Sequence, residues 1–149
     1  MNAAALTVRP ITSREVRELR HAVLRPFDPP EKLVYSGDED PDTLHAGAFD
    51  GETFVGIATV TREPLPGSHD LAHWRLRGMA TVSAVRGRGF GCALLERCFA
   101  HIRAKGGTLL WCNARVLALG FYEHLGFVAQ GEEFEIVPIG PHYVMTRTP

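Results

Sequence analysis

The chain has 149 residues, 45% hydrophobic and 22% charged, and a formal net charge of −1 at pH 7. This composition is typical of one globular domain, spanning residues 1–149, with enough apolar residues for a substantial core. The near-neutral charge argues against a general nucleic-acid-binding protein, and no apolar run approaches the ~20 residues of a membrane span. The sequence carries no N-terminal signal peptide, so we expect a cytoplasmic protein.

The first segments predict a strand, a capped helix and a long loop. Leu6–Ile11 is typical of a strand. Thr12-Ser13-Arg14-Glu15 matches a capping box, and the apolar residues at 16, 19, 23 and 24 then fall on one helical face. Residues 25–44 carry four prolines and a run of four acidic residues between 38 and 42. This segment is too long for a plain connector, so we expect a functional loop, with room for a short helix.

A hairpin and a longer strand follow. Asp50-Gly51 is a strong turn signal between the strand-like segments 45–49 and 54–61. A second loop spans 64–70. The next strand, 74–82, alternates, and this predicts one face with Trp74, Leu76, Ala80 and Val82 and another with Arg75, Arg77, Met79 and Thr81.

The remaining elements complete a mixed sheet. A helix runs from about residue 90 to Lys105, with the apolar stripe Leu94, Leu95, Cys98, Phe99 and Ile102, and Gly106-Gly107 ends it. We expect a strand at 108–112, a helix at 114–125 closed by Gly126, and strands at 134–137 and 143–146. The predicted order is β-α-β-β-β-α-β-α-β-β. A strand, crossover helix and strand in its middle imply a parallel pair inside an α/β sheet.

The cysteines give no sign of disulfides or of a metal site. Cys92, Cys98 and Cys112 are odd in number and lack C-x-x-C spacing, which is typical of reduced, mostly buried thiols in a cytosolic protein. His101 and Cys98 are helical neighbours, but two ligands without a third do not make a metal site. We therefore predict no metal.

The most informative stretch is Arg-Gly-Arg-Gly-Phe-Gly at 86–91, between the strand at 74–82 and the next helix. Glycines let a backbone approach a ligand closely, and a helix N-terminus suits a phosphate or diphosphate. The P-loop pattern fails because no Lys-Ser or Lys-Thr follows the glycines, and the dinucleotide fingerprint fails because Cys92 stands at its third glycine. The pattern [QR]-x-x-G-x-[GA] fits, as Arg86, Gly89 and Gly91.

At this point the chain resembles the GNAT superfamily of acyltransferases, over nearly its whole length. Met79-Ala80-Thr81-Val82 is similar to that family's fourth strand. Ala118, Phe121-Tyr122-Glu123 and Leu125-Gly126-Phe127 match its A-x-x-[FL]-Y-E-x-L-G-F segment. The tail at 140–145, Gly-Pro-His-Tyr-Val-Met, resembles small bacterial ElaA-like members. The resemblance implies a mixed central sheet of about seven strands flanked by about four helices, with the fourth and fifth strands splayed apart.

The resemblance also implies a donor site for acetyl-CoA. The backbone of residues 86–91 would hold the coenzyme A diphosphate, and the pantetheine would pair with the strand edge in the gap between the splayed strands. The strand backbone would also polarise the thioester carbonyl. Arg115 stands where many members have Asn. The implied cofactor-binding residues are Met79, Ala80, Thr81, Val82, Arg86, Gly87, Arg88, Gly89, Phe90, Gly91 and Tyr122.

For catalysis, the resemblance makes Tyr122 the proton donor to the departing thiolate, since a phenol with a pKa of about 10 is protonated at neutral pH. A core-packing tyrosine is the alternative, and both roles can hold together. The amine acceptor needs a base, for which His142 is our choice. His45, Glu133 and Glu135 are further candidates, and a structural or solvated role is open for each of the four.

We therefore expect an N-acetyltransferase that acts on a primary amine of a small molecule or peptide by direct attack in a ternary complex. The acidic run Asp38, Glu39, Asp40 and Asp42 either attracts a cationic amine or is simply solvated. A non-catalytic acyl-CoA-binding sensor is the main rival, and another nucleotide-phosphate binder a second. A homodimer is compatible with the sequence, which indicates no interface.

Overall fold

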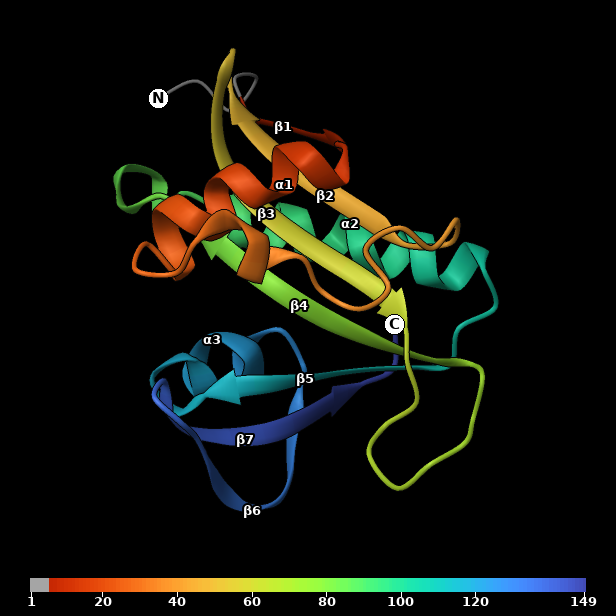
Figure 1. Ribbon diagram of the computed structural model, residues 1–149. Helices are drawn as coiled ribbons and strands as arrows, with labels where there is room; N and C mark the ends of the chain where they lie inside the picture. Colours follow the sequence, from red (N-terminus) through yellow and green to blue (C-terminus); the bar gives the residue numbers. More distant parts are fainter. Residues whose placement is uncertain (1–5) are drawn as a thin grey trace.

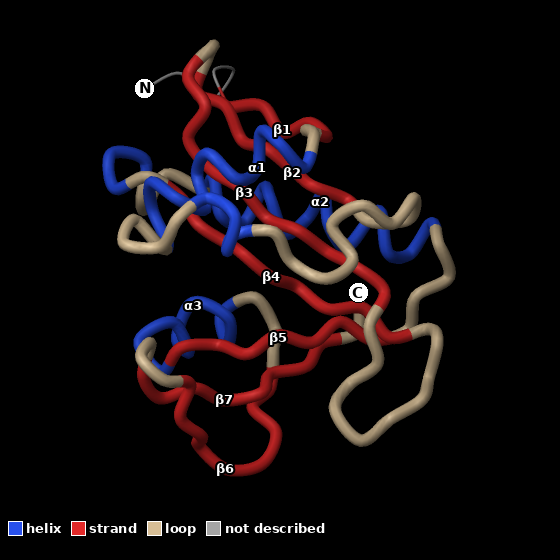
Figure 2. Tube along the Cα trace, in the orientation of Figure 1, coloured by secondary structure: helices blue, strands red, loops and turns tan. Residues whose placement is uncertain are grey.

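Seven strands form one mixed sheet in the computed structural model, which describes residues 6–149; residues 1–5 of the expected domain lie outside the described part. The strand order is β1-β2-β3-β4-β5-β7-β6 (Figures 1 and 2). Only β4 and β5 run parallel; every other neighbouring pair is antiparallel. The strands are β1 (Leu6–Pro10), β2 (Leu44–Asp50), β3 (Thr53–Arg62), β4 (His73–Thr81), β5 (Leu109–Arg115), β6 (Val128–Ile136) and β7 (Gly140–Arg147). The predicted element order and α/β class are confirmed.

Three α-helices flank the sheet in the described residues: α1 (Ser13–Leu19), α2 (Phe90–Ala104) and α3 (Leu119–His124). A π-helical segment, Arg20–Leu24, continues α1. The expected number of about four is one too high for α-helices, because the short helix of the 25–44 loop is the 3-10 turn Pro30–Leu33. None of the helices within residues 6–149 is long and apolar enough to cross a membrane.

Each face of the sheet is covered by its own helix (Figure 1). The predicted stripe of α2 is buried without exception, and it packs with Trp74, Leu76 and Leu110 in the larger core cluster. Val16 and Leu19 of α1 cover the opposite face, with Ile57. Full burial of one such side chain contributes about 1.5–3 kcal/mol, so the two clusters hold the sheet from both sides.

The helix caps follow the sequence signals. The Thr12 hydroxyl accepts the Glu15 N–H at 3.0 Å, and the Glu15 carboxylate accepts the Thr12 N–H at 2.9 Å, which completes the predicted capping box. At the end of α3, Gly126 has φ +89° and the Phe127 N–H donates to the Tyr122 carbonyl at 3.0 Å. This cap fixes the entry into β6.

Two predicted boundaries in the last third are wrong. The helix expected at 114–125 begins only at Leu119, because β5 continues to Arg115 and pairs with β7 along its length. Sheet pairing here outweighs the helical pattern of the sequence. The strand expected at 134–137 begins at Val128. Its first six residues are exposed on both faces, so they show no alternation for a sequence pattern to detect.

A β-bulge in β4 overturns the predicted alternation of that strand. Gly78 and Met79 stand opposite one residue of β3, and Gly78 has φ +61°. The extra residue reverses the two faces beyond it. Ala80 therefore packs with the α1 cluster, opposite to Trp74 and Leu76, whereas Met79 packs against the α2 cluster.

Candidate active site

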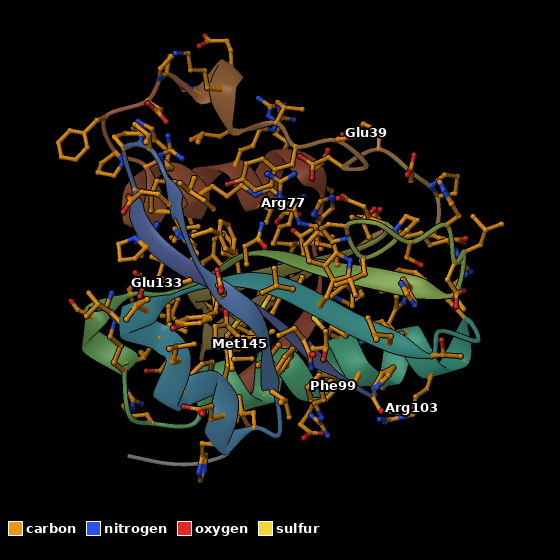
Figure 3. All side chains as sticks on the ribbon, turned by 90° about the horizontal axis from the view of Figure 1, so that it is seen from below. Glu39, Arg77, Phe99, Arg103, Glu133 and Met145 are labelled. Atoms are coloured by element: carbon orange, nitrogen blue, oxygen red, sulfur yellow. The ribbon has the colours of Figure 1, made fainter. Side chains whose placement is uncertain are left out.

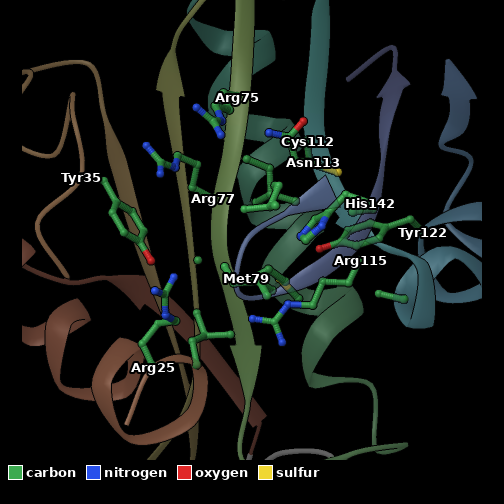
Figure 4. Close-up of a pocket in the computed structure, with 17 residues that line it drawn as sticks. Arg25, Tyr35, Arg75, Arg77, Met79, Cys112, Asn113, Arg115, Tyr122 and His142 are labelled. Carbon is green, nitrogen blue, oxygen red and sulfur yellow. The ribbon is translucent and has the colours of Figure 1, made fainter. Parts of the chain in front are cut away.

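A cavity lies in the gap between β4 and β5. The two strands pair only where His73–Arg75 meet Leu109–Trp111, and beyond that end they diverge (Figure 1). A cavity of about 490 Å³ opens there, lined from β4, β5, β7, α3 and the segment after α1 (Figure 4). This volume lies in the range of small-molecule sites. The predicted splaying of the fourth and fifth strands is thus confirmed.

Tyr122 reaches this cavity from α3. Its ring packs edge-on against Phe121 and Phe127, with centroids 5.2 and 5.3 Å away, and only 8% of the residue is exposed. The hydroxyl points into the cavity (Figure 4). Burial raises the pKa of the phenol, an effect that the Arg115 charge opposes in part. The group is therefore a protonated donor at neutral pH, and it is also a core residue.

His142 reaches the same cavity from β7 and is 4% exposed. Its Nδ1 lies 2.7 Å from the Gly140 carbonyl oxygen. Since a carbonyl only accepts hydrogen bonds, Nδ1 carries the proton in the neutral ring and Nε2 carries the lone pair. The cavity therefore contains a proton donor on Tyr122 and a proton acceptor on His142.

The cavity wall is cationic. Within the described chain its lining contains no carboxylate but four arginines: Arg25, Arg75, Arg77 and Arg115. Two of these arginines form salt bridges with carboxylates: Arg75 with Glu63 at 3.0 Å, and Arg25 with Asp28 at 2.6 Å.

Arg77 differs from those two. Its guanidinium stacks on the Tyr35 ring, 4.2 Å from the centroid, and no carboxylate of residues 6–149 forms a salt bridge with it. Burial, helped by the charge of Arg75, lowers the pKa of Arg77. A guanidinium nevertheless keeps its proton in proteins, so the cavity holds a permanent positive charge here.

The cavity also exposes a thiol that is inert. Cys112 lines it, and burial raises the pKa of Cys112 to about 12. Burial does the same for Cys98 in the core. Neither group is a thiolate at neutral pH, and the thiolate is the nucleophilic form. All the cysteines are free, and both of these are buried as predicted.

The glycine loop precedes α2. Gly87 and Gly89 have φ +80° and +86°, a backbone conformation that favours glycine. The first hydrogen bond of this helix runs from the Ala93 N–H to the Gly89 carbonyl, so the amides of residues 90–92 have no acceptor inside the helix. A Cβ at Gly91 would lie 3.1 Å from Phe121 and 3.3 Å from Met79, so only glycine fits there without a shift.

The other predicted donor-site residues lie around this loop. Arg86 donates to the Thr81 carbonyl at 3.4 Å, and Arg88 pairs with Asp50 at 3.1 Å. The Phe90 side chain is 1% exposed in the core, so it offers a ligand only its backbone. The Val82 N–H donates to the Val55 carbonyl of β3 at 2.9 Å. Because backbone groups alternate between the two edges of a strand, the backbone N–H and C=O of Thr81 point to the opposite edge, toward the gap.

A buried ion-pair network underlies the 25–44 loop. Asp38 accepts two hydrogen bonds from Arg20, at 2.7 and 3.0 Å, and one from the Tyr35 amide at 2.9 Å. His45 bridges the Asp38 carbonyl and the Thr59 hydroxyl. Of the two roles left open for His45, these contacts show the structural one, because the residue is buried outside the cavity. They correct the expectation for Asp38, which is neither a free acid nor solvated.

The remaining candidates lie elsewhere. Asp42 pairs with Arg62 and Lys105, at 2.8 and 3.3 Å. Glu133 and Glu135 are exposed on β6 and do not line the cavity. Among the described residues, no group of three or more His, Cys, Asp or Glu is placed to hold a metal ion.

Sequence reasoning missed three residues that shape the cavity. Gly78 supplies the bulge, and a glycine inside a strand pattern was a signal for it. Tyr35 carries the stacking surface for Arg77, but as an isolated aromatic residue in a proline-rich loop it gives no signal. Arg20 is completely buried, and nothing in its sequence context indicates that it points inward.

The splayed sheet, the glycine loop at a helix N-terminus and the tyrosine-lined cavity together define an acyltransferase class of site. Residues 13–127 match the family described as Acetyltransferase (GNAT) family. Because this match covers most of the chain, the protein belongs to the GNAT family, as its two sequence motifs predicted. It is an N-acetyltransferase by family, with acetyl-CoA as the family's acyl donor.

Known proteins are similar to this one, in sequence or in fold, along nearly its whole length. An N-acetyltransferase of Bacillus subtilis (strain 168), YitI, whose own role is uncharacterized, is 34% identical over 143 residues, covering 96% of each chain. ElaA of Escherichia coli has the same fold, with a TM-score of 0.76 at 19% identity over 95% of this chain and 99% of its own. An aminoglycoside 6'-N-acetyltransferase complexed with coenzyme A has a TM-score of 0.72 at 15% identity, over 95% and 96%.

Proposed function

We propose that this protein transfers an acetyl group from acetyl-CoA to a primary amine of a small molecule or peptide, by direct attack within a ternary complex. One observation carries the proposal. The O–H of Tyr122 and the unprotonated Nε2 of His142 line one cavity, beside the unpaired edge of β4. Acyl transfer to an amine needs a proton donor and a proton acceptor in that place.

The start of α2 fits a diphosphate. The amides of residues 90–92 have no acceptor within the helix, and Gly87 and Gly89 leave open space where a Cβ would stand. The helix dipole and the Arg86 side chain add positive potential at the same point. A diphosphate of coenzyme A bound here would receive backbone hydrogen bonds. The coenzyme A complex of the structurally similar aminoglycoside acetyltransferase supports this choice of ligand.

The free edge of β4 fits the pantetheine arm. Beyond Arg75 this strand has no hydrogen-bonded neighbour on the β5 side, and the N–H and C=O of Thr81 face the gap. An extended amide chain can add to such an edge like a further strand. The thioester supplies the activated acetyl group, and backbone N–H groups of β4 are the donors available to stabilise its carbonyl oxygen.

Tyr122 serves as the proton donor. The phenol stays protonated at neutral pH because burial raises its pKa. When the C–S bond breaks, negative charge develops on sulfur, and Tyr122 donates its proton there. The charge on Arg115 favours the transient phenolate, since it opposes the effect of burial.

His142 serves as the base. Its Nε2 accepts a proton from the amine as the C–N bond forms, while the Gly140 carbonyl holds the Nδ1 proton in place. The amine loses one proton to His142 and the thiolate gains one from Tyr122, so the amide and the free thiol are the products. Transfer of the proton from His142 back to Tyr122 through solvent then restores the enzyme. No covalent enzyme intermediate is needed, which is consistent with the protonated thiol of Cys112.

Calorimetric titration with acetyl-CoA, followed by a thiol-release assay over a panel of amines, tests the proposal. Tyr122→Phe should lower kcat by about 10²–10⁴-fold and leave acetyl-CoA affinity nearly unchanged. Tyr143→Phe is the matched control, because this tyrosine lies outside the cavity lining. Unchanged turnover in Tyr122→Phe would remove its role. Binding of acetyl-CoA without thiol release from any amine would favour the non-catalytic sensor instead.

A further inference from the structure

The cavity has two chemically different sides, divided by the bulge in β4. Before the bulge, Arg75 and Arg77 point to the side of α1 and the 25–44 loop, where Arg77 stacks on Tyr35. After it, Met79 points to the side of α2 and approaches Gly91. Figure 3 shows Arg77 next to the α1 side of the sheet and Phe99 and Arg103 of α2 on the other side. The first side is therefore separate from the proposed diphosphate site.

Distance along the strand supports this separation. Arg77 lies four residues before the end of β4 at Thr81, which is about 13 Å of extended chain. The glycine loop begins only after a further 3-10 turn, Ser83–Val85. The basic residues of that loop are Arg86 and Arg88. Arg77 thus lies on the acceptor side of the cavity, away from the proposed diphosphate.

The acceptor side carries a net positive charge. Arg25 and Arg75 have carboxylate partners at 2.6 and 3.0 Å, whereas Arg77 and Arg115 have no salt-bridge partner among residues 6–149. Asp38 of the acidic run is not available, because Arg20 occupies both of its carboxylate oxygens. A positively charged group placed here would meet arginines, and the nearby carboxylate of Glu63 is already paired with Arg75.

Arg77 is also held in position. The Tyr35 ring supports its guanidinium at 4.2 Å and is itself fixed by Arg20, whose guanidinium lies 3.9 Å from the same ring centroid. The Tyr35 amide is bonded to Asp38 at 2.9 Å. A planar, preorganised guanidinium without a counter-ion matches the geometry of a carboxylate, which it can bind through two parallel hydrogen bonds.

We infer that the acceptor carries a carboxylate besides its primary amine, as an amino acid does, and that Arg77 binds this carboxylate. The inference rests on the proposed function and narrows its substrate class. It argues against polyamines and aminoglycosides, although an aminoglycoside acetyltransferase shares the fold. The carboxylate would orient the amine toward Tyr122 and His142, which line the same cavity.

Matched acceptors of equal chain length test the inference in a thiol-release assay with acetyl-CoA. 4-Aminobutyrate, n-butylamine and 1,4-diaminobutane differ only in the terminal group, and L-leucine and isoamylamine differ only in the carboxylate. We expect kcat/KM to be about 10–100-fold higher for each amino acid than for the monoamine that lacks its carboxylate, the range of a charge-assisted pair. The diamine should be the poorest of the first three. 3-Aminopropylphosphonate distinguishes a carboxylate site from a general oxyanion site.

Variants of Arg77 test whether this residue causes the preference for acceptors with a carboxylate. Arg77→Gln should lower kcat/KM for 4-aminobutyrate about 10–100-fold while changing n-butylamine by less than about threefold, and Arg77→Lys should restore part of the difference. Arg103→Gln, on an exposed residue of α2, is the control. If Arg77→Gln does not fold, the panel of acceptors measured with the wild-type protein still decides whether the acceptor carries a carboxylate.

The outcomes separate this inference from the proposed function. Acetyl-CoA binding without thiol release from any acceptor would overturn both. Turnover of n-butylamine or the diamine equal to that of 4-aminobutyrate would overturn the inference alone. So would a preference for the phosphonate, or an equal loss on all acceptors in a folded Arg77→Gln variant.

Discussion

Replacing Asp38 by Asn should destabilise the protein strongly, because it removes a buried charge and leaves its partner in place. Arg20 is 0% exposed and Asp38 is 5% exposed. The Arg20 guanidinium also donates to the Leu33 carbonyl and the Thr59 hydroxyl, so its position is fixed from several sides. An asparagine has the same shape as aspartate, but it cannot neutralise the guanidinium.

The expected loss follows from the burial of the pair. Removing one partner of a buried ion pair costs about 3–5 kcal/mol, a large part of a total stability of about 5–15 kcal/mol. For a chain of this length the melting temperature should fall by about 6–20 °C. Replacing both residues, as Arg20→Met with Asp38→Leu, should recover most of the loss, because no uncompensated charge then remains.

The pH dependence of the free energy of unfolding checks the contribution of the Arg20–Asp38 pair independently. Burial raises the pKa of Asp38, but the hydrogen bonds from Arg20 and the Tyr35 amide outweigh it and hold the pKa below its ordinary value. In the unfolded chain the same carboxyl titrates near its ordinary pKa of about 4. The stabilisation is therefore complete above about pH 4 and is lost as the pH falls toward the lower pKa of the folded state.

Urea unfolding of the wild type and Asp38→Asn between pH 3 and pH 7 measures both effects. The difference in free energy of unfolding should be constant from pH 5 to 7 and should narrow below about pH 4. Asp42→Asn is the control, since the Asp42 carboxylate pairs on the surface at 40% exposure and should contribute little. A loss at pH 7 no larger than in this control, or one independent of pH, would refute the account of the network.

Two further predictions concern the bulge and the thiols. Gly78→Ala puts a Cβ at φ +61° and 3.2 Å from Arg20 Nε, so it should cost at least about 1–2 kcal/mol and raise KM for the acceptor without changing acetyl-CoA affinity. Gly67→Ala, at φ +86° in open space, controls for backbone strain alone, and an equal KM in both variants would contradict a role for the bulge. Because burial raises the pKa of Cys98 and Cys112 to about 12, iodoacetamide at pH 8 should label only Cys92 in the folded protein. Mass spectrometry showing more than one adduct per chain would contradict this.

Local patterns in the sequence were sufficient for much of the fold. The capping box at Thr12, the α2 stripe and the turn at Gly51 are each determined by residues close together in the chain, and the structure contains all three. The predicted element boundaries were wrong where pairing with a strand distant in the sequence determines where an element ends. β5 extends to Arg115 because β7 pairs with it, and no local signal reports that partner.

The candidate site divides in the same way. The proposed donor side is contiguous in sequence, since the strand edge, the glycine loop and the first turn of α2 follow one another, so motif spacing alone could suggest it. The cavity beside it brings together Arg25, Tyr35, Arg77, Arg115 and His142 from separate elements. Only folding brings these residues together. For that reason the acidic run of the 25–44 loop left a cationic acceptor open beside simple solvation, whereas the assembled cavity is lined by arginines.

The bulge at Gly78 explains how one strand serves both sides. Without the extra residue, Met79 would lie on the same face as Arg75 and Arg77, by the alternation of a regular strand. The bulge turns Met79 toward α2 and Gly91, while Arg77 remains on the side of Tyr35. A bulge also bends its strand, and this one lies just beyond the point, Arg75, where β4 stops pairing with β5. In the function proposed here, a single residue of positive φ thus separates the side of the cavity where Arg77 would bind the acceptor's carboxylate from the side of the proposed diphosphate site.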